Sequence, residues 1–557
     1  MIVLGLNGFT NEHDAAAALI INGELRGFAE EERFTRIKRA INLYPHNAVK
    51  WLLHDNDITI DDIDVFALGW DIPKMIDLGF NYEFSDYLDD KKKIINIITG
   101  YTPNKAPEIV YVPHHIAHAA SSFFSSGYKE AISIVLDGRG EESSISCYIA
   151  RDNTLSELRH WNIAFSLGFL YEAASFYSGF SDWDAGKTMG LSSYAVNSCP
   201  LNDFMQWKDD EIILFNQFSD YNSVDLCERW LEMLYSKFGV PQFPASKWNS
   251  ILNSYDVTYD KSIISKIAEG AGAVQETVVD IISSIIRYCI RETGISNICL
   301  SGGVALNCAA NGRIANLCSN LFIFPAANDA GTAFGAAAWI ASQNDEIDLI
   351  LESALVGPEF NKNEIQGILN KCNIKYTLSS NPIKSVSEYL LDGKTVGWFQ
   401  GRMEMGPRAL GARSILAYPN GNPGRDVVNS IKSREKWRPF APSLLAEEQT
   451  ALFYDDFISR YMLLGVKVKP RTVSLFPDIV HVDCTSRPHT VLPQDGEYYD
   501  LLSQLKHDSG TGIVLNTSFN GRNEPIVCTP YDAIRTFFST GLDILYLDGY
   551  IITKNRI

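Results

Sequence analysis

Short apolar runs separated by polar turns form the pattern of the first thirty residues. An apolar run at 2–6 comes first, and Asn22-Gly23 then joins the run AAAALII to the segment ELRGFAEEE. Asn-Gly between two such segments is a strong hairpin signal. The pattern returns at 131–161, where a glycine-rich polar loop and an Asp-Asn turn separate three further runs. Two such units are a weak internal repeat and predict a duplicated fold with three-stranded halves.

Two later segments extend this repeat. The pattern at 297–316 predicts a strand, a Gly-Gly turn and a helix, and the pattern at 321–341 predicts a strand, a loop around Asp329 and a helix of small residues. Together with the repeat, they predict an α/β chain that begins with the duplicated ribonuclease-H-like domain of the actin, sugar-kinase and heat-shock ATPase superfamily. In that fold, the loop after the first strand of each half faces bound nucleotide.

Turn-forming residues at 354–365 (ALVGPEFNKNEI) indicate a domain boundary. We therefore expect one domain at 1–355 and a second α/β domain at 360–557. The aromatic and charged stretch at 200–260 is expected to be an insertion with helices.

Three of the ten histidines lie within VPHHIAHAASSFFSSG, residues 112–127. The apolar run before them predicts a buried strand, and the residues after it predict a helix. His114 and His118 are four residues apart, so they share one face of that helix and could bind one metal ion. The alternative is that one histidine packs in the core and the other lies in solvent.

Two aspartates could complete a metal site. Asp137 ends a predicted strand and Asp329 lies in the loop after another, and a duplicated fold brings both loops to one cleft. With His114 and His118 they would form a site of two histidines and two carboxylates. Such ligands suit iron(II), manganese, zinc or cobalt, and they do not choose among them. The alternatives are a turn residue at Asp137 and a helix N-cap at Asp329.

Glycine loops follow several of the predicted strands. Loops of this kind bring backbone N–H groups close to phosphate, and a helix N-terminus adds its positive end. Their glycines are Gly138, Gly140, Gly302, Gly303 and Gly331. They predict a nucleotide site. Lys187, in AGKTMGLSSY, is a further candidate, with an ordinary surface loop as the alternative.

His13 and Asp14 follow the first predicted strand on the cleft side. A histidine beside carboxylates is a natural general base. The alternative is a capping or core histidine.

Basic and hydroxyl residues gather in three motifs of the second predicted domain. Arginine presents a planar fork to phosphate or carboxylate, and short hydroxyl and amide side chains complete such sites. Their neighbours are Gly, Pro, Trp and Phe rather than polar stripes, which favours an anion pocket over a solvated basic face. The residues are Arg402, Arg408 and Arg413, then Lys432, Arg434, Lys436 and Arg438, then Thr517, Ser518 and Asn520.

Composition excludes several classes of function. The chain has 557 residues, which is too long for one ordinary core, and a net charge of −19, which argues against broad nucleic-acid binding. No apolar stretch approaches the ~18 residues that span a bilayer, and the first residues lack the features of a signal peptide. The ten cysteines form no CxxC motif. We expect a reduced, cytoplasmic protein that binds neither nucleic acid nor membrane.

Six motifs resemble those of the O-carbamoyltransferases of the nodulation-protein and antibiotic-tailoring type, a family whose members carbamoylate tobramycin, cephem and ansamycin hydroxyls. The motifs are HHIAHAASSFF, LDGRGE, SGGVALNCAANGR, GRMEMGPRALGARSI, REKWRPFAPS and NTSFNGRNEPIV. The resemblance covers nearly the whole chain. It implies a Kae-like N-terminal domain, similar to tRNA-threonylcarbamoyl transferases, and a YrdC-like C-terminal domain.

The resemblance also implies an ATP-dependent reaction in two steps. Carbamoyl phosphate and ATP would form carbamoyl-adenylate and pyrophosphate in the C-terminal domain. A hydroxyl of a small natural product would then attack the carbamoyl carbon in the N-terminal domain, and AMP would leave. Mg²⁺ would accompany the ATP.

Site residues follow motif by motif from the same resemblance. His114, His118, Asp137 and Asp329 would hold the divalent ion, with iron(II) favoured. Gly138, Arg139, Gly302, Gly303 and Asn307 would line the nucleotide. Arg408, Lys432, Arg438, Ser518 and Asn520 would grip carbamoyl phosphate and the adenylate, Lys432 and Arg438 acting also in catalysis. His13, with Asp14, would take the acceptor's proton.

The chain departs from the family at one point. Some members carry an aspartate two residues before the equivalent of His13, whereas this chain has Asn11 there and Glu12 next. Either Glu12 or Asp14 could orient the base, or His13 could act alone.

Two rival functions remain, a fused tRNA-threonylcarbamoyl enzyme and a non-catalytic nucleotide-binding regulator of the same fold. The acidic charge disfavours the first rival, and the basic motifs disfavour the second. The hydrogenase-maturation type is disfavoured because its acylphosphatase segment and CxxC modules are absent. The sequence does not identify the acceptor, whose specificity we expect in 70–105 and 200–260. A homodimer is the expected assembly.

Overall fold

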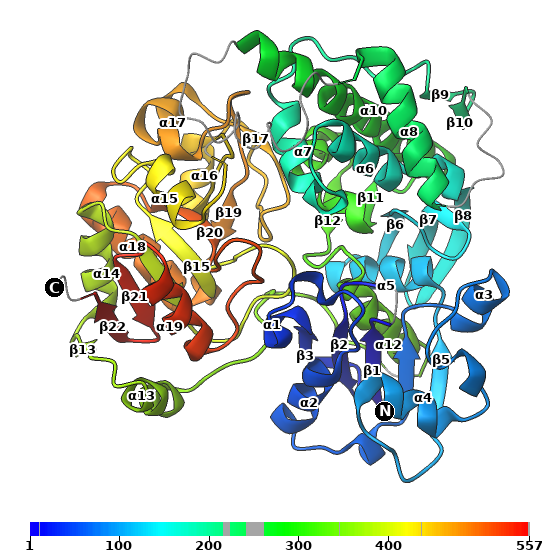
Figure 1. The fold of residues 1–557 in the computed structure, drawn as a ribbon, viewed down its shortest axis with the longest axis horizontal. Coiled ribbons are helices and arrows are strands. Elements are labelled where there is room, and N and C mark those ends of the chain that lie inside the picture. The colour runs from blue at the N-terminus through cyan, green and yellow to red at the C-terminus, as the bar shows by residue number, and fades with distance from the viewer. Residues whose placement is uncertain (10–11, 216–222, 241–260, 345, 436, 555–557) are drawn as a thin grey trace. The chain divides into compact units, whose positions relative to one another are not determined.

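The computed structural model of the chain describes residues 1–9, 12–215, 223–240, 261–344, 346–435 and 437–554 (Figure 1). Contacts divide it into two compact units. The first comprises residues 1–35 and the described residues from 39 to 352, and the second comprises residues 36–38 and those from 353 onward. Asn11, Lys436 and parts of the predicted insertion, at 216–222 and 241–260, lie outside the described residues.

The first unit contains two five-stranded sheets with one topology. The order is β3-β2-β1-β4-β5 in one sheet and β8-β7-β6-β11-β12 in the other. In each, the first three strands are antiparallel neighbours and the last two run parallel to the strand beside them. The strands are β1 Ile2–Asn7, β2 Ala16–Ile21, β3 Glu24–Glu30, β4 Val65–Leu68, β5 Glu108–Tyr111, β6 Glu130–Leu136, β7 Ser143–Arg151, β8 Thr154–Asn162, β11 Asn297–Ser301 and β12 Asn320–Ile323. The predicted duplication of an α/β fold is confirmed.

Two helices of small residues, α5 (His114–Ser126) and α12 (Ala330–Asn344), pack against each other and against these sheets. The contact is close because glycine leaves room for it. A Cβ on Gly335 would lie 1.8 Å from the carbonyl oxygen of Ala117, and one on Gly5 would lie 1.9 Å from that of Ala333. This packing fixes the start of each helix at the carboxyl end of the strand before it.

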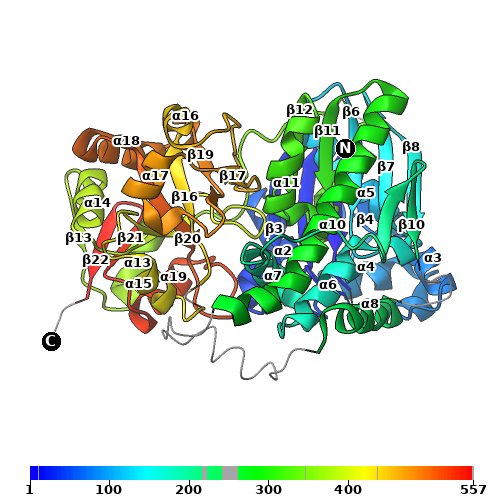
Figure 2. The same ribbon diagram turned by 90° about the horizontal axis from the view of Figure 1, so that it is seen from above.

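The other helices of this unit surround the sheets, and in both views α10 lies beside α6 and α7 (Figure 2). They are α1 Glu32–Thr35, α2 His46–Asp55, α3 Ile72–Asp77, α4 Lys91–Thr99, α6 Leu167–Tyr177, α7 Ala185–Ser192, α8 Ser223–Phe238, α10 Lys261–Thr293 and α11 Cys308–Ile314. The predicted insertion does contain a helix, α8. It also contains a two-stranded hairpin, β9 (Met205–Lys208) with β10 (Glu211–Leu214), which the sequence analysis missed.

The second unit is built on one mixed sheet of eight strands, in the order β13-β22-β21-β14-β15-β20-β16-β19. Its strands are β13 Thr377–Leu378, β14 Val396–Phe399, β15 Arg413–Ala417, β16 Ala441–Leu445, β19 His489–Val491, β20 Ile513–Ser518, β21 Ile544–Leu547 and β22 Tyr550–Thr553. A small ribbon of β17 (Val466–Lys467) and β18 (Thr485–Ser486) stands apart from it. Its helices are α13 Lys362–Lys371, α14 Pro382–Leu391, α15 Arg425–Ile431, α16 Gln449–Leu452, α17 Pro470–Leu475, α18 Glu497–Ser509 and α19 Pro530–Ser539.

Aromatic side chains fill the core of the second unit. Trp398 stacks on Tyr546 with ring centroids 4.1 Å apart, and its indole N–H donates to the carbonyl oxygen of Gly411 at 2.9 Å. Gly411 has φ +93°, and a Cβ there would lie 2.2 Å from the ring of Tyr498. The loop between β14 and β15 is therefore fixed to the core. Among the described residues, no helix combines the length and apolar character needed to cross a bilayer.

Candidate functional site

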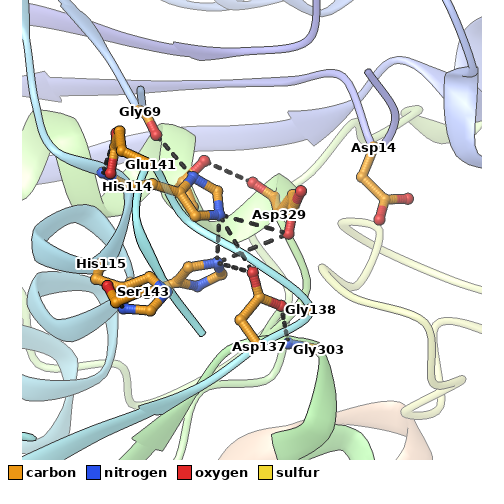
Figure 3. Close-up of polar contacts among 12 residues, drawn as sticks. Asp14, Gly69, His114, His115, Asp137, Gly138, Glu141, Ser143, Gly303 and Asp329 are labelled. Carbon is orange, nitrogen blue, oxygen red and sulfur yellow. Dashed lines mark hydrogen bonds and ion pairs between the residues drawn. The ribbon is translucent and has the colours of Figure 1, made fainter. Parts of the chain in front are cut away.

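The four residues predicted as metal ligands converge in the first unit (Figure 3). One ligand atom from each of His114, His118, Asp137 and Asp329 lies within 4.8 Å of the others, and all four residues are buried. The two Nε2 atoms are 3.1 Å apart. The Oδ2 atom of Asp137 lies 3.5 and 3.9 Å from them, and the Oδ1 atom of Asp329 lies 3.8 and 3.7 Å from them.

These separations test whether a cation fits. Ligand atoms about 2.0–2.2 Å from a tetrahedral ion lie roughly 3.3–3.6 Å from one another. The measured separations, 3.1–3.9 Å, bracket that range. Two neutral imidazoles and two carboxylates are also a donor set that binds divalent transition metals. The residues present therefore fit a divalent cation.

The first histidine is held so that Nε2 faces the cluster. Its Nδ1 donates to the carbonyl oxygen of Gly69 at 2.9 Å, which can only accept, so Nδ1 carries the proton. The indole of Trp70 stacks on the imidazole with centroids 3.7 Å apart. The backbone N–H of His114 donates to Glu141 at 2.9 Å, which satisfies a free donor at the start of α5. Backbone acceptors of this kind commonly orient metal-binding histidines.

The carboxylate of Asp137 is oriented in the same way. Its Oδ1 accepts a hydrogen bond of 2.9 Å from the backbone N–H of Gly303, which leaves Oδ2 for the cluster. Gly303 follows Gly302, whose φ is +87° and whose Cβ would lie 2.3 Å from the carbonyl oxygen of Leu136. Two of the predicted nucleotide glycines thus have a place in the cluster's support.

Electrostatics favour a positive charge at this point. Burial lowers the pKa of His114, but the hydrogen bond with Asp137 and the charge of Asp329 outweigh it and raise the pKa to about 9. The pKa of Asp137 is lowered, because contact with His114 and His118 overcomes the effect of burial. His118 Nδ1 is buried and has no hydrogen-bond partner among the described residues.

The third histidine of the motif does not join the cluster. His115 Nδ1 bonds with the hydroxyl of Ser146 at 2.7 Å, and burial followed by the charge of His114 lowers its pKa to about 3. It is a neutral core side chain on another face of α5. The alternative for His114 and His118, that one packs in the core and the other lies in solvent, is wrong, because both are buried and both contribute to the cluster.

The predicted base lies at the edge of the cluster. His13 Nδ1 is 3.1 Å from Asp14 Oδ2, and His13 Nε2 is 4.0 Å from Asp329 Oδ2. Burial lowers the pKa of His13, but the bond with Asp14 and the charge of Asp329 raise it to about 10. Asp14 is therefore the carboxylate that orients the imidazole of His13.

Glu12, the alternative partner, faces elsewhere. It accepts a bond of 3.5 Å from the hydroxyl of Tyr82, and burial raises its pKa. The backbone explains the choice. Asp14 has φ +56° and its N–H donates to the carbonyl of Arg39, which turns its side chain toward His13.

The remaining predicted nucleotide residues lie around the same strand ends. Arg139 extends over the ring of Phe80 at 4.1 Å. Asn307 caps α11, its Oδ1 accepting from the N–H of Ala310 at 3.0 Å, and its amide donates to Gln275 at 2.9 Å. Asn307 thus has a structural role, and Gly138 lies at a bend in the chain just before Arg139.

Lys187 does not lie in a surface loop. It belongs to α7, and its ammonium group donates to Asp184 at 3.0 Å. The alternative of a surface loop is wrong, because the motif is helical. A role of Lys187 in nucleotide binding stays a prediction.

The second unit gathers three of the predicted anion residues. The ammonium group of Lys432 donates to the carbonyl oxygen of Ser518 at 2.5 Å, to its hydroxyl at 3.1 Å and to the carbonyl oxygen of Asn520 at 3.0 Å; it also contacts the side-chain oxygen of Asn520. Burial, then the charges of Arg434 and Arg438, lower the pKa of Lys432 well below its usual value. Four oxygens thus surround the ammonium group of Lys432, whose charged form is disfavoured by burial and by the two nearby arginines.

Of the two remaining predicted residues, Arg438 acts electrostatically on this lysine. Arg438 is 28% exposed and pairs with Glu435 at 3.6 Å. Arg408 lies in the loop between β14 and β15. Asn516 joins that loop to β20 by donating to the carbonyl of Ala409 at 3.0 Å, two residues before Ser518.

Two arginines of the basic motifs have structural roles instead. Arg413 is fully buried, stacks over Phe399 at 3.6 Å and donates to four backbone carbonyl oxygens. Those carbonyls belong to Gln400, Ala412, Pro358 and Gly401. Arg434 donates to Asn429 and Pro439 and lies over Phe440. The prediction that Arg413 faces an anion is wrong, because both terminal nitrogens of its guanidinium group already donate to backbone carbonyl oxygens.

Sequence reasoning also missed several supporting residues. Glu141 lies in the LDGRGE motif and could have been noticed there, because it is acidic and follows Asp137, the first predicted ligand aspartate. Gly69, Trp70 and Trp183 carry no motif signal. Trp183 meets the ring of His13 edge to face, with centroids 5.1 Å apart.

Comparisons with known proteins match the sequence of this chain to one family. Residues 3–338 match the family described as Carbamoyltransferase N-terminus, and residues 387–554 match Carbamoyltransferase C-terminus. An uncharacterised protein of Synechocystis sp. is 32% identical, over 99% of this chain and 96% of that protein. The nodulation protein NolNO of Sinorhizobium fredii is 31% identical, over 100% of this chain and 83% of its own length.

Two further similarities are more limited in extent. The 3'-hydroxymethylcephem-O-carbamoyltransferase of Amycolatopsis lactamdurans is 34% identical, over 51% of this chain and 54% of that protein. Among solved structures, full-length HypF in a phosphate- and nucleotide-bound form covers 63% of this chain and 47% of its own, at 15% identity and a TM-score of 0.36.

Proposed function

The chain belongs to the carbamoyltransferase family and transfers a carbamoyl group to a hydroxyl acceptor, and from that premise we propose that the reaction is ATP-dependent and proceeds through carbamoyl-adenylate. The acceptor is a hydroxyl of a small natural product. In this proposal, the predicted N-terminal domain, residues 1–355, carries out the transfer. The second, 360–557, is a YrdC-like domain that forms the adenylate.

Adenylate formation consumes one water. Cleavage of carbamoyl phosphate by water gives carbamate and inorganic phosphate. A carbamate oxygen then attacks the α-phosphorus of ATP, and pyrophosphate leaves. Lys432, Arg408 and Arg438 bind the phosphate oxygens, because buried cations stabilise charge that a polyanion brings into a site poor in water. Ser518 and Asn520 hold the lysine and offer further polar contacts.

Transfer requires a stronger nucleophile than a neutral hydroxyl. His13, oriented by Asp14, would accept the acceptor's proton in its neutral form as the hydroxyl oxygen bonds to the carbamoyl carbon. A cation held beside Asp329 would favour that neutral form, because it offsets the carboxylate charge that raises the pKa of His13. The bond from that carbon to the AMP oxygen breaks, and the products are a carbamate ester and AMP. Gly138, Arg139, Gly302, Gly303 and Asn307 line the nucleotide in this proposal.

His114, His118, Asp137 and Asp329 would hold a divalent cation, with iron(II) favoured and manganese, zinc or cobalt as alternatives. Such a cation supplies a fixed positive charge for the phosphate oxygens of the departing nucleotide. The side chains themselves preorganise the site, because Gly69, Gly303 and Glu141 already hold the cluster in one orientation.

One observation carries the proposal. The oriented pair of His13 and Asp14 lies beside the four-residue cluster, with His13 Nε2 4.0 Å from Asp329. A base and a phosphate-binding cation within one site are what transfer from an adenylate to a hydroxyl requires.

The test separates the two half-reactions. The enzyme is incubated with ATP and carbamoyl phosphate, pyrophosphate is measured, and a panel of hydroxylated natural products is screened by mass spectrometry for an added carbamoyl group. Lys432→Ala is expected to abolish pyrophosphate formation. His13→Ala is expected to retain it but to lose transfer. Undiminished pyrophosphate release by Lys432→Ala, or normal product from His13→Ala, contradicts the assignment.

A further inference from the structure

We propose that Arg39 is a positioning residue that holds the pair of His13 and Asp14 in its productive orientation. Arg39 contacts no reacting atom; it acts through Asp14 on one side and through Trp183 on the other. The inference rests on the proposed function, because it assigns a task in the transfer step.

The backbone of Arg39 fixes Asp14. The N–H of Asp14 donates to the carbonyl oxygen of Arg39 at 2.6 Å, and the N–H of Arg39 donates to Glu32 Oε2 at 2.5 Å. Both residues have left-handed backbone, φ +65° at Arg39 and +56° at Asp14. Side-chain-bearing residues rarely adopt this region unless surrounding contacts hold them there. The carboxylate of Asp14 is therefore aimed at His13 by a strained pair of residues that support each other.

Glu32, which accepts the hydrogen bond from the backbone of Arg39, is itself held by neighbouring side chains. The second oxygen of Glu32, Oε1, pairs with Arg33 at 2.5 Å, and Arg33 in turn bonds with the buried carboxylate of Glu30. Arg33 is 3% exposed. Because its partners are fixed by burial, Glu32 is a rigid acceptor for the backbone of Arg39.

The side chain of Arg39 reaches the other side of the pair. Its guanidinium group lies over the ring of Trp183 at 4.4 Å and donates to the carbonyl oxygen of the same residue at 3.3 Å. Trp183 in turn meets the imidazole of His13 edge to face, with centroids 5.1 Å apart. A planar cation over an indole holds the ring in place, since the contact combines charge and stacking.

The consequence concerns the direction of the imidazole. Asp14 holds His13 through the hydrogen bond to Nδ1 alone. The ring of Trp183 limits rotation of the imidazole about that hydrogen bond. Trp183 is 38% exposed, so the core does not hold it by itself. Loss of the Arg39 side chain would free Trp183 and let His13 turn away from the cluster. Such a rotation of the imidazole would slow the proton transfer without changing how phosphates bind.

The experiment uses the full-length enzyme with ATP, carbamoyl phosphate and methanol as the acceptor probe. Pyrophosphate reports adenylate formation, and methyl carbamate reports transfer. Arg39→Ala is expected to lower kcat for methyl carbamate by ~10-fold or more, the range typical of lost orientation. KM for ATP and carbamoyl phosphate, pyrophosphate formation and Co²⁺ binding should stay at wild-type values. Arg39→Lys, which keeps a cation over the indole, is expected to recover part of the rate.

A double-mutant cycle supplies the readout that a merely structural role would not move. In a His13→Ala background, Arg39→Ala should cause no further loss, because its effect passes through His13. An equal further loss in that background, or a parallel fall of pyrophosphate formation and transfer, overturns the inference. So does an unchanged transfer rate in Arg39→Ala. If the wild-type enzyme forms neither pyrophosphate nor methyl carbamate, the proposed function fails first and this inference fails with it.

Discussion

The cluster of two histidines and two aspartates in the first unit and the lysine site of the second have opposite electrostatic character. The first gathers two carboxylates and two imidazoles around a point where a cation is favoured. The second gathers a buried lysine near two arginines, where an anion is favoured. Each group is oriented by backbone atoms. The lysine contacts four oxygens, whereas the donor atoms of the cluster lie 3.1–3.9 Å from one another. We therefore expect the cluster to bind a cation with little rearrangement, and the lysine to give up some of its contacts when an anion binds.

The largest expected effect separates two adjacent histidines of α5. His114→Ala should lose more metal affinity than the ~10–100-fold that loss of an outer partner costs, because it removes a ligand atom. His115→Ala is the matched control and should bind metal normally, although it leaves a cavity in the core. Titration with Co²⁺, followed by its visible absorption, measures both. Equal affinity in the two variants would remove the difference between ligand and core histidine.

The second effect separates two arginines of the second unit. Arg413→Met should reduce the free energy of unfolding by ~3 kcal/mol or more, since it leaves four buried carbonyl oxygens without their donor. Arg438→Met should change stability by less than ~1 kcal/mol, because the residue is partly exposed.

For KM of carbamoyl phosphate the order is reversed, and Arg438→Met should have the larger effect of the two. Arg438→Met should raise KM for carbamoyl phosphate by ~10-fold, the scale of a lost charge-assisted bond. Urea unfolding and pyrophosphate release measure the two properties. If Arg438→Met proved the less stable variant, the division into a structural and a binding arginine would be wrong.

A buried histidine of the second unit makes stability depend on pH. Burial lowers the pKa of His489 to about 3, while its hydroxyl partner is Ser443 at 2.9 Å. The unfolded chain binds the proton near pH 6.5 and the folded one does not, so stability is lost as pH falls from about 6.5 toward 3. This residue alone should cost about 2 kcal/mol between pH 7.5 and pH 5.

The control for this prediction is His489→Gln. Urea midpoints of the variant should fall less steeply over the same interval, by the equivalent of about one proton. An identical slope in the two proteins would show that His489 is protonated in the folded state.

The smallest single effect is expected for Glu12, which is compared with Asp14, the other carboxylate near His13. Glu12→Gln should change kcat of transfer by less than ~3-fold, because Glu12 faces Tyr82 rather than the base. Asp14→Asn should lower it by ~100-fold, within the range for general-base catalysis. Methyl carbamate formation from methanol measures both. A larger loss in Glu12→Gln would reverse the assignment of the orienting partner.

Local pattern was sufficient for the strands of the internal repeat, the duplication and the four residues of the cluster. The spacing of His114 and His118 is a helical property, and Asp137 and Asp329 follow strands whose ends the duplication brings together. These relations depend on periodicity and topology, which a sequence displays directly.

Roles that depend on distant backbone could not be predicted in this way. Arg413 and Arg438 have similar glycine- or aromatic-rich neighbours, and only the approach of residues near 358 and 400 distinguishes them. The choice of Asp14 over Glu12 depends on a left-handed backbone held by Arg39. The helical state of Lys187 was missed because its segment contains two glycines.

The most direct test of the two-site account is the ratio of the two half-reactions in Asp137→Asn. This substitution alters only one oxygen of the cluster, and all its described contacts lie in the first unit. The account predicts pyrophosphate release from ATP and carbamoyl phosphate at the wild-type rate, with methyl carbamate formation reduced by ~100-fold. Loss of both activities in a folded variant, or transfer at the wild-type rate, would contradict it.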